Sequence, residues 1–227
     1  IDKHVSAIMG VNLWGGACDP ERLEHYAKDR GLKLLFVMQL GLYASLSSFS
    51  WSGEYIGERN TFNRFHGQGT YVSGRGLKYE GNWIDGRKSG KGVQTWSNGD
   101  IYNGDWLENK RNGLGVQTWA DGGKYDGEWV GGKRNGKGVY TFVNGDVYTG
   151  SFRANIKKGQ GEIVYKNGSR YRGSWDKDLR AGKGLIIYKN GSVLEGQWKE
   201  GKFAGRGTFA TKKYKYTGVI RNGKPHG

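Results

Sequence analysis

The chain has 227 residues, a formal net charge of +15, 42 glycines, 2 prolines and many aromatic side chains (9 Trp, 14 Tyr and 8 Phe). A disordered chain would be poor in large aromatic residues, so this composition favours many short strands joined by tight turns. Residues 79–227 hold 27 of the 36 basic and 14 of the 21 acidic side chains, which points to an anionic partner, either lipid or nucleic acid. Cys18 is the single cysteine, which excludes an internal disulfide or a thiolate zinc site and fits a reducing compartment.

The first 50 residues form a segment without a recognisable function. Asp19-Pro20-Glu21 predicts the start of a helix that ends near Gly31, because Asp caps helix N-termini and Pro favours the first helical position. Residues 34–53 carry no charge and are long enough to cross a membrane. Gln39 and a series of serines instead favour a buried helix or a pair of strands. We therefore expect residues 1–50 to be partly helical.

A five-residue pattern, aromatic-x-Gly-x-aromatic, dominates the rest of the chain. Its clearest copies run from Tyr79, Tyr102 and Tyr125, at intervals of 23 residues. Further copies, some with one ring replaced, start at residues 148, 171, 194 and 216. A fixed period predicts a repeat architecture. We expect an irregular first repeat with a longer loop over residues 51–78, and about six full repeats plus a partial one over residues 79–227. Because the chain stops in mid-unit, we also expect it to be a piece of a longer protein.

Each repeat has the pattern of a β-hairpin. Alternation places Tyr79, Gly81 and Trp83 on one face of a strand, after which Asp85-Gly86 reverses the chain. A second strand runs from Gly90 to Trp96 and closes on Asn98-Gly99, which predicts a two-residue turn with positive φ. The predicted fold is all-β, an elongated, twisted single-layer antiparallel β-ribbon of repeated hairpins with a short helical N-terminal segment.

The glycines of each repeat are predicted to form a surface on which the rings lie. Gly81, Gly90 and Gly92 share a face with the aromatic residues, so the rings can pack over bare backbone. The rings are first of all core residues. Because a single-layer sheet has no second sheet to cover them, they are also candidates for a groove that takes a partner helix or peptide. Interlocking with glycine argues against the stacking of nucleic-acid bases. The groove candidates are Tyr79, Trp83, Tyr102, Trp106, Tyr125, Trp129, Trp175 and Trp198.

With its Tyr-x-Gly-x-Trp pattern, turn glycine and Gly-x-Gly pair, the chain resembles the MORN (membrane occupation and recognition nexus) family. The resemblance implies a twisted β-ribbon with an aromatic groove, serving as a scaffold for partner proteins or acidic phospholipid headgroups. It also implies that such arrays can be attached to lipid kinases, to a lysine methyltransferase or to membrane-junction proteins. Leu194 and Ile220 replace rings of the pattern, and Lys212-Lys213 replaces the Asn-Gly turn.

Basic residues precede and separate the paired glycines in nearly every repeat. We expect them to form a stripe along one edge of the sheet that binds an anionic surface. The alternative is that they are solvated turn residues that prevent pairing at the sheet edge. The candidates are Arg87, Lys88, Lys91, Lys110, Arg111, Lys133, Arg134, Lys137, Lys157, Lys158, Arg180, Lys183, Lys202 and Arg206.

For catalysis the sequence offers no recurring constellation of histidines, carboxylates or nucleophiles, and no phosphate-binding Gly-Lys-Ser/Thr loop. We expect no catalytic residue, cofactor or metal. The predicted function is a non-enzymatic scaffold or adaptor that binds partner proteins, an acidic phospholipid membrane, or both. The alternatives are the targeting or regulatory region of a larger enzyme, of the phosphatidylinositol phosphate kinase or lysine methyltransferase type, and a homodimer formed end to end. We expect a cytoplasmic location, peripheral at a membrane or the cytoskeleton.

Overall fold

The structure is a computed structural model that describes residues 53–221 and 223–226. The predicted helix after Asp19 and the uncharged stretch as far as residue 52 lie outside the described residues. Within the described part, no helix is long and apolar enough to span a membrane.

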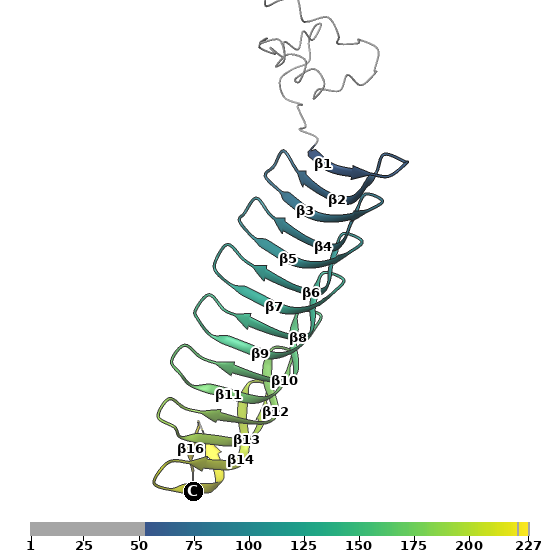
Figure 1. The fold of residues 1–227 in the computed structure, drawn as a ribbon. Helices are drawn as coiled ribbons and strands as arrows, with labels where there is room; N and C mark the ends of the chain where they lie inside the picture. Colours follow the sequence, from purple (N-terminus) through teal and green to yellow (C-terminus); the bar gives the residue numbers. More distant parts are fainter. Residues whose placement is uncertain (1–52, 222, 227) are drawn as a thin grey trace, which may run out of the picture. The chain divides into compact units, whose positions relative to one another are not determined.

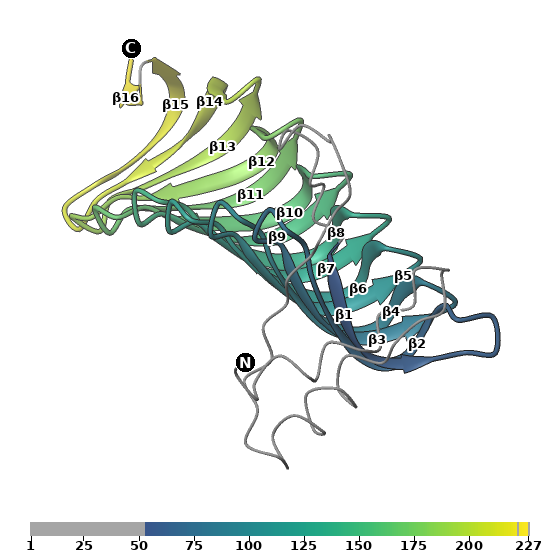
Figure 2. The same cartoon turned by 90° about the horizontal axis from the view of Figure 1, so that it is seen from above.

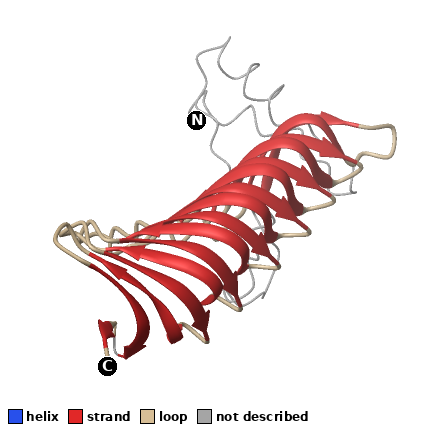
Figure 3. Ribbon diagram, turned by 90° about the horizontal axis from the view of Figure 1, so that it is seen from below, coloured by secondary structure: helices blue, strands red, loops and turns tan. Residues whose placement is uncertain are grey.

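The described chain is one open antiparallel sheet of 16 strands that pair in sequence order (Figure 1). The predicted all-β ribbon of repeated hairpins is therefore confirmed. The strands bend strongly along their own length (Figure 2), and the part described contains strands and loops only (Figure 3). The strands are β1 (Glu54–Arg59), β2 (Phe65–Val72), β3 (Lys78–Ile84), β4 (Arg87–Thr95), β5 (Ile101–Leu107), β6 (Lys110–Thr118), β7 (Lys124–Val130), β8 (Lys133–Thr141), β9 (Val147–Arg153), β10 (Ile156–Val164), β11 (Arg170–Asp176), β12 (Leu179–Ile187), β13 (Val193–Lys199), β14 (Lys202–Ala210), β15 (Lys215–Arg221) and β16 (Lys224–Pro225).

A continuous row of glycines runs across the sheet, one glycine per strand. Gly81 of β3 pairs with Gly92 of β4, which pairs in turn with Gly104 of β5, and the series continues from β1 to β15. The Tyr79 ring lies directly on two of these glycines, because a methyl group added at Gly92 would lie 2.5 Å from Tyr79 Cζ. The predicted packing of rings on bare backbone is confirmed for this row.

The rings form one aromatic ladder along the sheet. Tyr79 makes edge-to-face contacts with Trp83 in its own repeat, at 4.9 Å between ring centroids, and with Trp106 in the next, at 5.4 Å. Tyr79 Oη donates a hydrogen bond to the Asn82 carbonyl at 3.0 Å, and Trp106 Nε1 donates to the Gly92 carbonyl at 3.1 Å. Tyr79 is fully buried although only one sheet is present. We infer that the rings lie on the inner side of the bend, since a flat single sheet would leave both faces in water.

The first glycine of each pair has a different role from the one predicted. The pairs Gly81–Gly92 and Trp83–Lys88 are two residues apart along β3 but four residues apart along β4. The extra residues form a bulge in β4. Gly90 lies in this bulge with φ +76°, and a Cβ added to it would face Asn82 on the opposite side of the sheet. The prediction that Gly90 supports the rings is therefore wrong, because a left-handed residue directs its side-chain position away from them.

Of the two turns in each repeat, the one at Asn98-Gly99 differs from the prediction. Gly99 has φ +90°, whereas Asn98 is not in the left-handed region. Gly99 N donates to the Trp96 carbonyl and Trp96 N to the Asp100 carbonyl, both at 2.9 Å, which describes a three-residue loop with a left-handed glycine at its end. The two-residue turn with positive φ at both positions is instead Asp85-Gly86, at φ 50° and 81°.

Near the C-terminal end, Phe203 compensates for Leu194. Leu194 stands where other repeats have tyrosine, and it is too short to cover Gly196 and Gly207. Phe203 comes from the neighbouring strand and covers both glycines, since a methyl group at Gly196 would lie 2.5 Å from Phe203 Cζ. Its ring contacts Trp198 edge to face at 5.4 Å, as the tyrosines do in other repeats.

We expect Gly92→Ala to lower the free energy of unfolding by about 1–3 kcal/mol, because the new methyl group would overlap the Tyr79 ring. Urea unfolding followed by tryptophan fluorescence measures the change. Gly123→Ala is the matched control: its Cβ would have no neighbour closer than 3.2 Å, and its φ is not left-handed. Equal losses in the two variants would contradict the role assigned to the glycine row.

We expect Phe203→Lys alone to destabilise the protein by about 3 kcal/mol, because it uncovers Gly196 and Gly207. Adding Leu194→Tyr restores the arrangement of the other repeats and should recover most of this loss. A double-mutant cycle by thermal and urea unfolding should give a coupling of about 1 kcal/mol or more. Strictly additive effects would show that Phe203 does not replace the missing tyrosine.

Candidate functional site

The structure distributes the predicted basic residues over different surfaces. One set lies exposed beside the two-residue turns: Arg87, Lys110, Lys133 and Lys202. A second set lies exposed on the face opposite the rings, or in the bulges: Lys91, Lys137, Lys158, Lys183 and Arg206. The third set is partly buried against the rings: Lys88, Arg111, Arg134, Lys157 and Arg180. The prediction of a single edge stripe is therefore wrong, because adjacent residues of a strand point to opposite faces.

The third set forms a row, called here the cation row, that lies on the aromatic ladder. Lys88 Nζ lies 4.9 Å from the Tyr79 ring centroid and 5.0 Å from that of Trp106. Arg111 Cζ lies 5.7 Å from Tyr102 and 4.2 Å from Trp129. Each cation thus bridges a tyrosine of its own repeat and a ring of the next, and cation–π attraction of this kind is stronger when the charge is desolvated. Equivalent contacts hold Arg134, Lys157 and Arg180.

Strand register places the cation row on this face. Lys88 pairs directly with Trp83 and Arg111 with Trp106, so each cation shares a face with the indole opposite it. The row is bounded by two phenylalanines. Phe65 stacks on Tyr55 at a centroid distance of 3.7 Å near one end, and Phe203 occupies the corresponding position at the other.

The hydrogen bonds of the cation row go to neutral acceptors. Arg111 Nη1 donates to Gln117 Oε1 at 2.8 Å and its Nη2 to the Gly132 carbonyl at 3.0 Å. Lys88 Nζ donates to Gln94 Oε1, and Arg134 Nη2 donates to the Asn155 carbonyl at 2.9 Å. Within the described residues, no carboxylate lies within 4.0 Å of any member of the row. The row is therefore held in place by neutral groups, without an ion pair to any carboxylate of the described residues.

Burial has an electrostatic consequence for the cation row. Desolvation lowers the pKa of the Lys88 ammonium to about 8. Desolvation likewise lowers the pKa of Arg111 and of Lys157, although the Asp178 carboxylate partly opposes the effect at Lys157. An anion brought against these groups would favour their charged forms.

A second row of rings lies beside the cation row and is only partly buried. Its members are Trp96, Trp119, Phe142, Tyr165 and Tyr188. An open recess of about 550 Å³ is lined by Trp96, Trp119, Arg111 and Gln117, together with Asp100 and the adjoining turn. The Asp100 carboxylate accepts a hydrogen bond from the Ala120 amide at 2.9 Å. This surface combines aromatic walls with the Arg111 guanidinium, and Asp100 at the turn is the carboxylate on its lining.

The groove residues predicted from the pattern itself are core residues. Tyr79, Tyr102 and Tyr125 are fully buried, and Trp83, Trp106, Trp129, Trp175 and Trp198 are 2–6% exposed. A partner on this face would contact the cation row and the Trp96–Tyr188 row instead. The signal in the sequence is positional: the accessible rings immediately precede the three-residue loops, whereas the buried ones flank the first glycine of a repeat.

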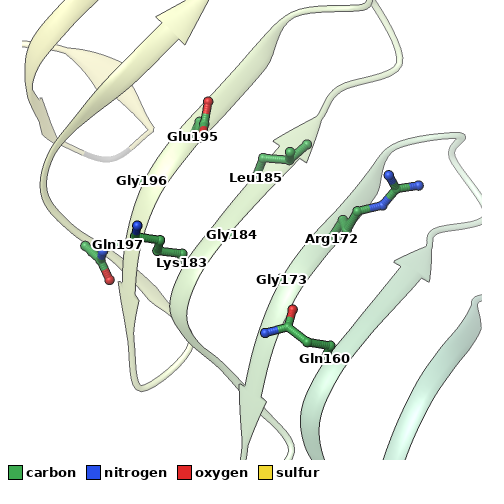
Figure 4. Close-up of a pocket in the computed structure, with 9 residues that line it drawn as sticks. All are labelled: Gln160, Arg172, Gly173, Lys183, Gly184, Leu185, Glu195, Gly196 and Gln197. Atoms are coloured by element: carbon green, nitrogen blue, oxygen red, sulfur yellow. The ribbon is translucent and has the colours of Figure 1, made fainter. Parts of the chain in front are cut away.

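The opposite face carries charges of both signs. Lys91 Nζ lies 2.8 Å from Asp105 Oδ1, and Arg172 Nη2 lies 3.4 Å from Glu162 Oε1. Figure 4 shows a shallow depression on this face, where Arg172, Lys183 and Glu195 surround a stretch of the glycine row. Residues 53–221 and 223–226 contain no cluster of three metal-ligating side chains. The expected absence of a catalytic centre and of a cofactor stays a prediction.

The comparisons with known proteins agree with the repeat pattern. The model of the MORN repeat matches residues 61–78, 79–101, 102–124, 125–147, 148–170, 171–193, 195–212 and 216–227. No curated protein matches the chain.

Among solved structures, the TCP domain of SAS-4 (dCPAP) from Drosophila melanogaster, in complex with a proline-rich motif of Ana2, is 17% identical. It covers 80% of this chain and 99% of its own, with a TM-score of 0.45. The TCP10 domain of Danio rerio CPAP is 11% identical and covers 68% of this chain and 72% of its own, with a TM-score of 0.40. At these identities and TM-scores the likeness has no bearing on function.

Proposed function

Because this chain belongs to the MORN repeat family, we propose that it is a non-enzymatic scaffold that binds a partner protein along its aromatic face. One observation carries the proposal. A row of five cations lies partly buried on this face without a carboxylate from the described residues, and a row of partly exposed rings runs beside it. Partly buried charges are costly when unpaired, and aromatic residues and arginine are enriched where proteins contact each other.

The fold suits a scaffold that offers one surface over many repeats. Each strand pairs only with its chain neighbours, so each repeat places its side chains at corresponding positions along the sheet. Some of the buried groups on this face differ between repeats. Gln94 and Gln117 accept from the cations near one end of the array, whereas Ile163 and Ile186 occupy the equivalent positions further on.

A second candidate function is docking on an acidic membrane through the hairpin tips. Ile84, Leu107 and Val130, which precede the two-residue turns, are 54–55% exposed. Arg87, Lys110 and Lys133 pair with them across the turns. Apolar side chains beside basic ones favour the interface of an anionic bilayer. This surface is distinct from the aromatic face.

To test the scaffold, a random peptide library displayed on phage is selected against the wild-type protein, and the enriched peptides are titrated by calorimetry. We expect Trp119→Ala/Phe142→Ala to weaken binding at least tenfold, because it removes two neighbouring walls of the aromatic face. Leu114→Ala/Val139→Ala, on the opposite face of the same two repeats, is the matched control and should change affinity less than about twofold. Failure to enrich any peptide, or equal weakening by both variants, would overturn the scaffold proposal.

The membrane candidate predicts that Arg87→Glu/Lys110→Glu/Lys133→Glu releases the protein from vesicles that contain phosphatidylserine. Three lost contacts at about 1 kcal/mol each amount to a fall in partitioning of roughly a hundredfold. Co-sedimentation at physiological salt measures it, with phosphatidylcholine vesicles as the neutral comparison. Lys91→Glu/Lys137→Glu/Lys183→Glu reverses as many charges away from the tips, and the same loss in this variant would argue against docking by the tips.

A further inference from the structure

The cation row has a regular spacing that the sheet fixes. Successive members occupy the same register position, paired with Trp83, Trp106, Trp129, Phe152 and Trp175 in turn. Two strand separations lie between neighbours, and strands are about 4.7–4.9 Å apart. The cations therefore recur roughly every 9.4–9.8 Å.

This spacing discriminates between the conformations that a bound peptide can adopt. A polyproline II helix has three residues per turn and a rise of 3.1 Å, so every third residue points the same way about every 9.3 Å. In a β-strand the third residue points to the opposite face. In an α-helix the nearest repeat on one face is seven residues, about 10.5 Å, which falls out of step by roughly 3–4 Å over four intervals. The polyproline II helix alone stays in step along the whole row.

The walls of the face fit the same conformation. Proline-rich segments in the polyproline II form dock into grooves lined by aromatic side chains. An open recess between Trp96 and Trp119 has such aromatic walls, with the Arg111 guanidinium and the Asp100 carboxylate on its lining. Phe142, Tyr165 and Tyr188 continue the wall at the same position of later repeats. Apolar residues between the acidic ones would contact these rings.

We propose that the aromatic face binds an acidic segment in the polyproline II conformation, with a carboxylate at every third residue and one carboxylate for each cation from Lys88 to Arg180. The inference rests on the proposed scaffold function and specifies the chemistry of its partner. Charge complementarity supports it, since the hydrogen bonds of Arg111 and Arg134 go to neutral oxygens and leave other guanidinium N–H groups to donate to a carboxylate.

The position of the cations favours a narrow chain over a flat surface. Lys88, Arg111 and Lys157 are partly buried among rings, whereas Arg87 and Lys110 at the hairpin tips are exposed. A membrane reaches exposed tips first, and a peptide can enter between the rings. Vesicle binding is therefore an alternative outcome of the test.

The test uses fluorescence anisotropy, at physiological salt, with a fluorescein-labelled peptide made of five Glu-Pro-Pro triplets. The spacing control has five Glu-Pro pairs followed by a run of five prolines, so its length, composition and charge are the same. The charge control has five Gln-Pro-Pro triplets. We expect the Glu-Pro-Pro peptide to bind at least tenfold more tightly than either control. Equal binding of the two acidic peptides would overturn the spacing argument, and this comparison needs no variant of the protein.

Variants then locate the peptide. Arg111→Gln/Arg134→Gln/Arg180→Gln should weaken the binding of the Glu-Pro-Pro peptide at least tenfold. Lys110→Gln/Lys133→Gln/Lys202→Gln removes as many exposed charges and should weaken it less than about twofold. Circular dichroism and thermal melts verify that both variants are folded. Equal effects of the two variants would overturn the assignment to the cation row.

The outcomes separate this inference from the scaffold function. If the Glu-Pro-Pro peptide does not bind while library-selected peptides still require Trp119 and Phe142, the spacing inference fails and the scaffold stands. If the peptide does not bind, and the Arg111→Gln/Arg134→Gln/Arg180→Gln variant instead no longer binds vesicles that contain phosphatidylserine, the cation row contacts a membrane. The peptide inference then fails.

Discussion

The contact between a tyrosine ring and the glycine row underlies the whole structure. A single-layer sheet has no second layer to cover an apolar face, and this chain covers it by laying each ring flat on two paired strands. Only glycine permits this, because a methyl group at Gly92 or Gly115 would fall on a tyrosine ring. The glycines of this row are therefore a packing requirement, whereas Gly86, Gly90 and Gly99 supply the positive φ of turns and bulges. Each tyrosine hydroxyl then donates to a carbonyl three residues on, so the buried polar atom is satisfied.

The cation row follows from the same arrangement. With the tyrosines flat, the ring faces and edges form a continuous surface, and a long basic side chain opposite each indole can lie across it. The bulge at Gly90 lets Lys88 pair with Trp83 in spite of the extra residues in β4. Phe203 shows how closely the two features are linked. Where the tyrosine is missing, the side chain at the cation position turns down onto the glycines, and the row of charges ends.

Much of this fold could be predicted from the sequence, because it depends on period and alternation. Identical spacing of Tyr79, Tyr102 and Tyr125 implies identical pairing, and a glycine in register with a glycine is implied by the 23-residue period. The bulge could not be predicted in this way. The sequence Gly-x-Gly is compatible both with two glycines that face the rings and with one that has a left-handed backbone. The period alone groups Arg87 with Lys88, because both recur at corresponding places of each repeat, but neighbouring residues of a strand point to opposite faces. Asn98-Gly99 fits either of two turns, and the choice depends on how the flanking strands end.

The indole hydrogen bonds give the array a polarity along the chain. Trp106 donates to the Gly92 carbonyl, Trp129 to that of Gly115, and Trp198 to that of Gly184, always 14 residues earlier and never later. Every buried indole thus depends on the strand that was synthesised before it. Removal of a repeat at the C-terminal end leaves all remaining indoles with their acceptors. Removal of a repeat at the N-terminal end leaves the buried indole N–H of the next repeat without its acceptor, which is costly. The two ends of the array therefore differ in how well they tolerate shortening.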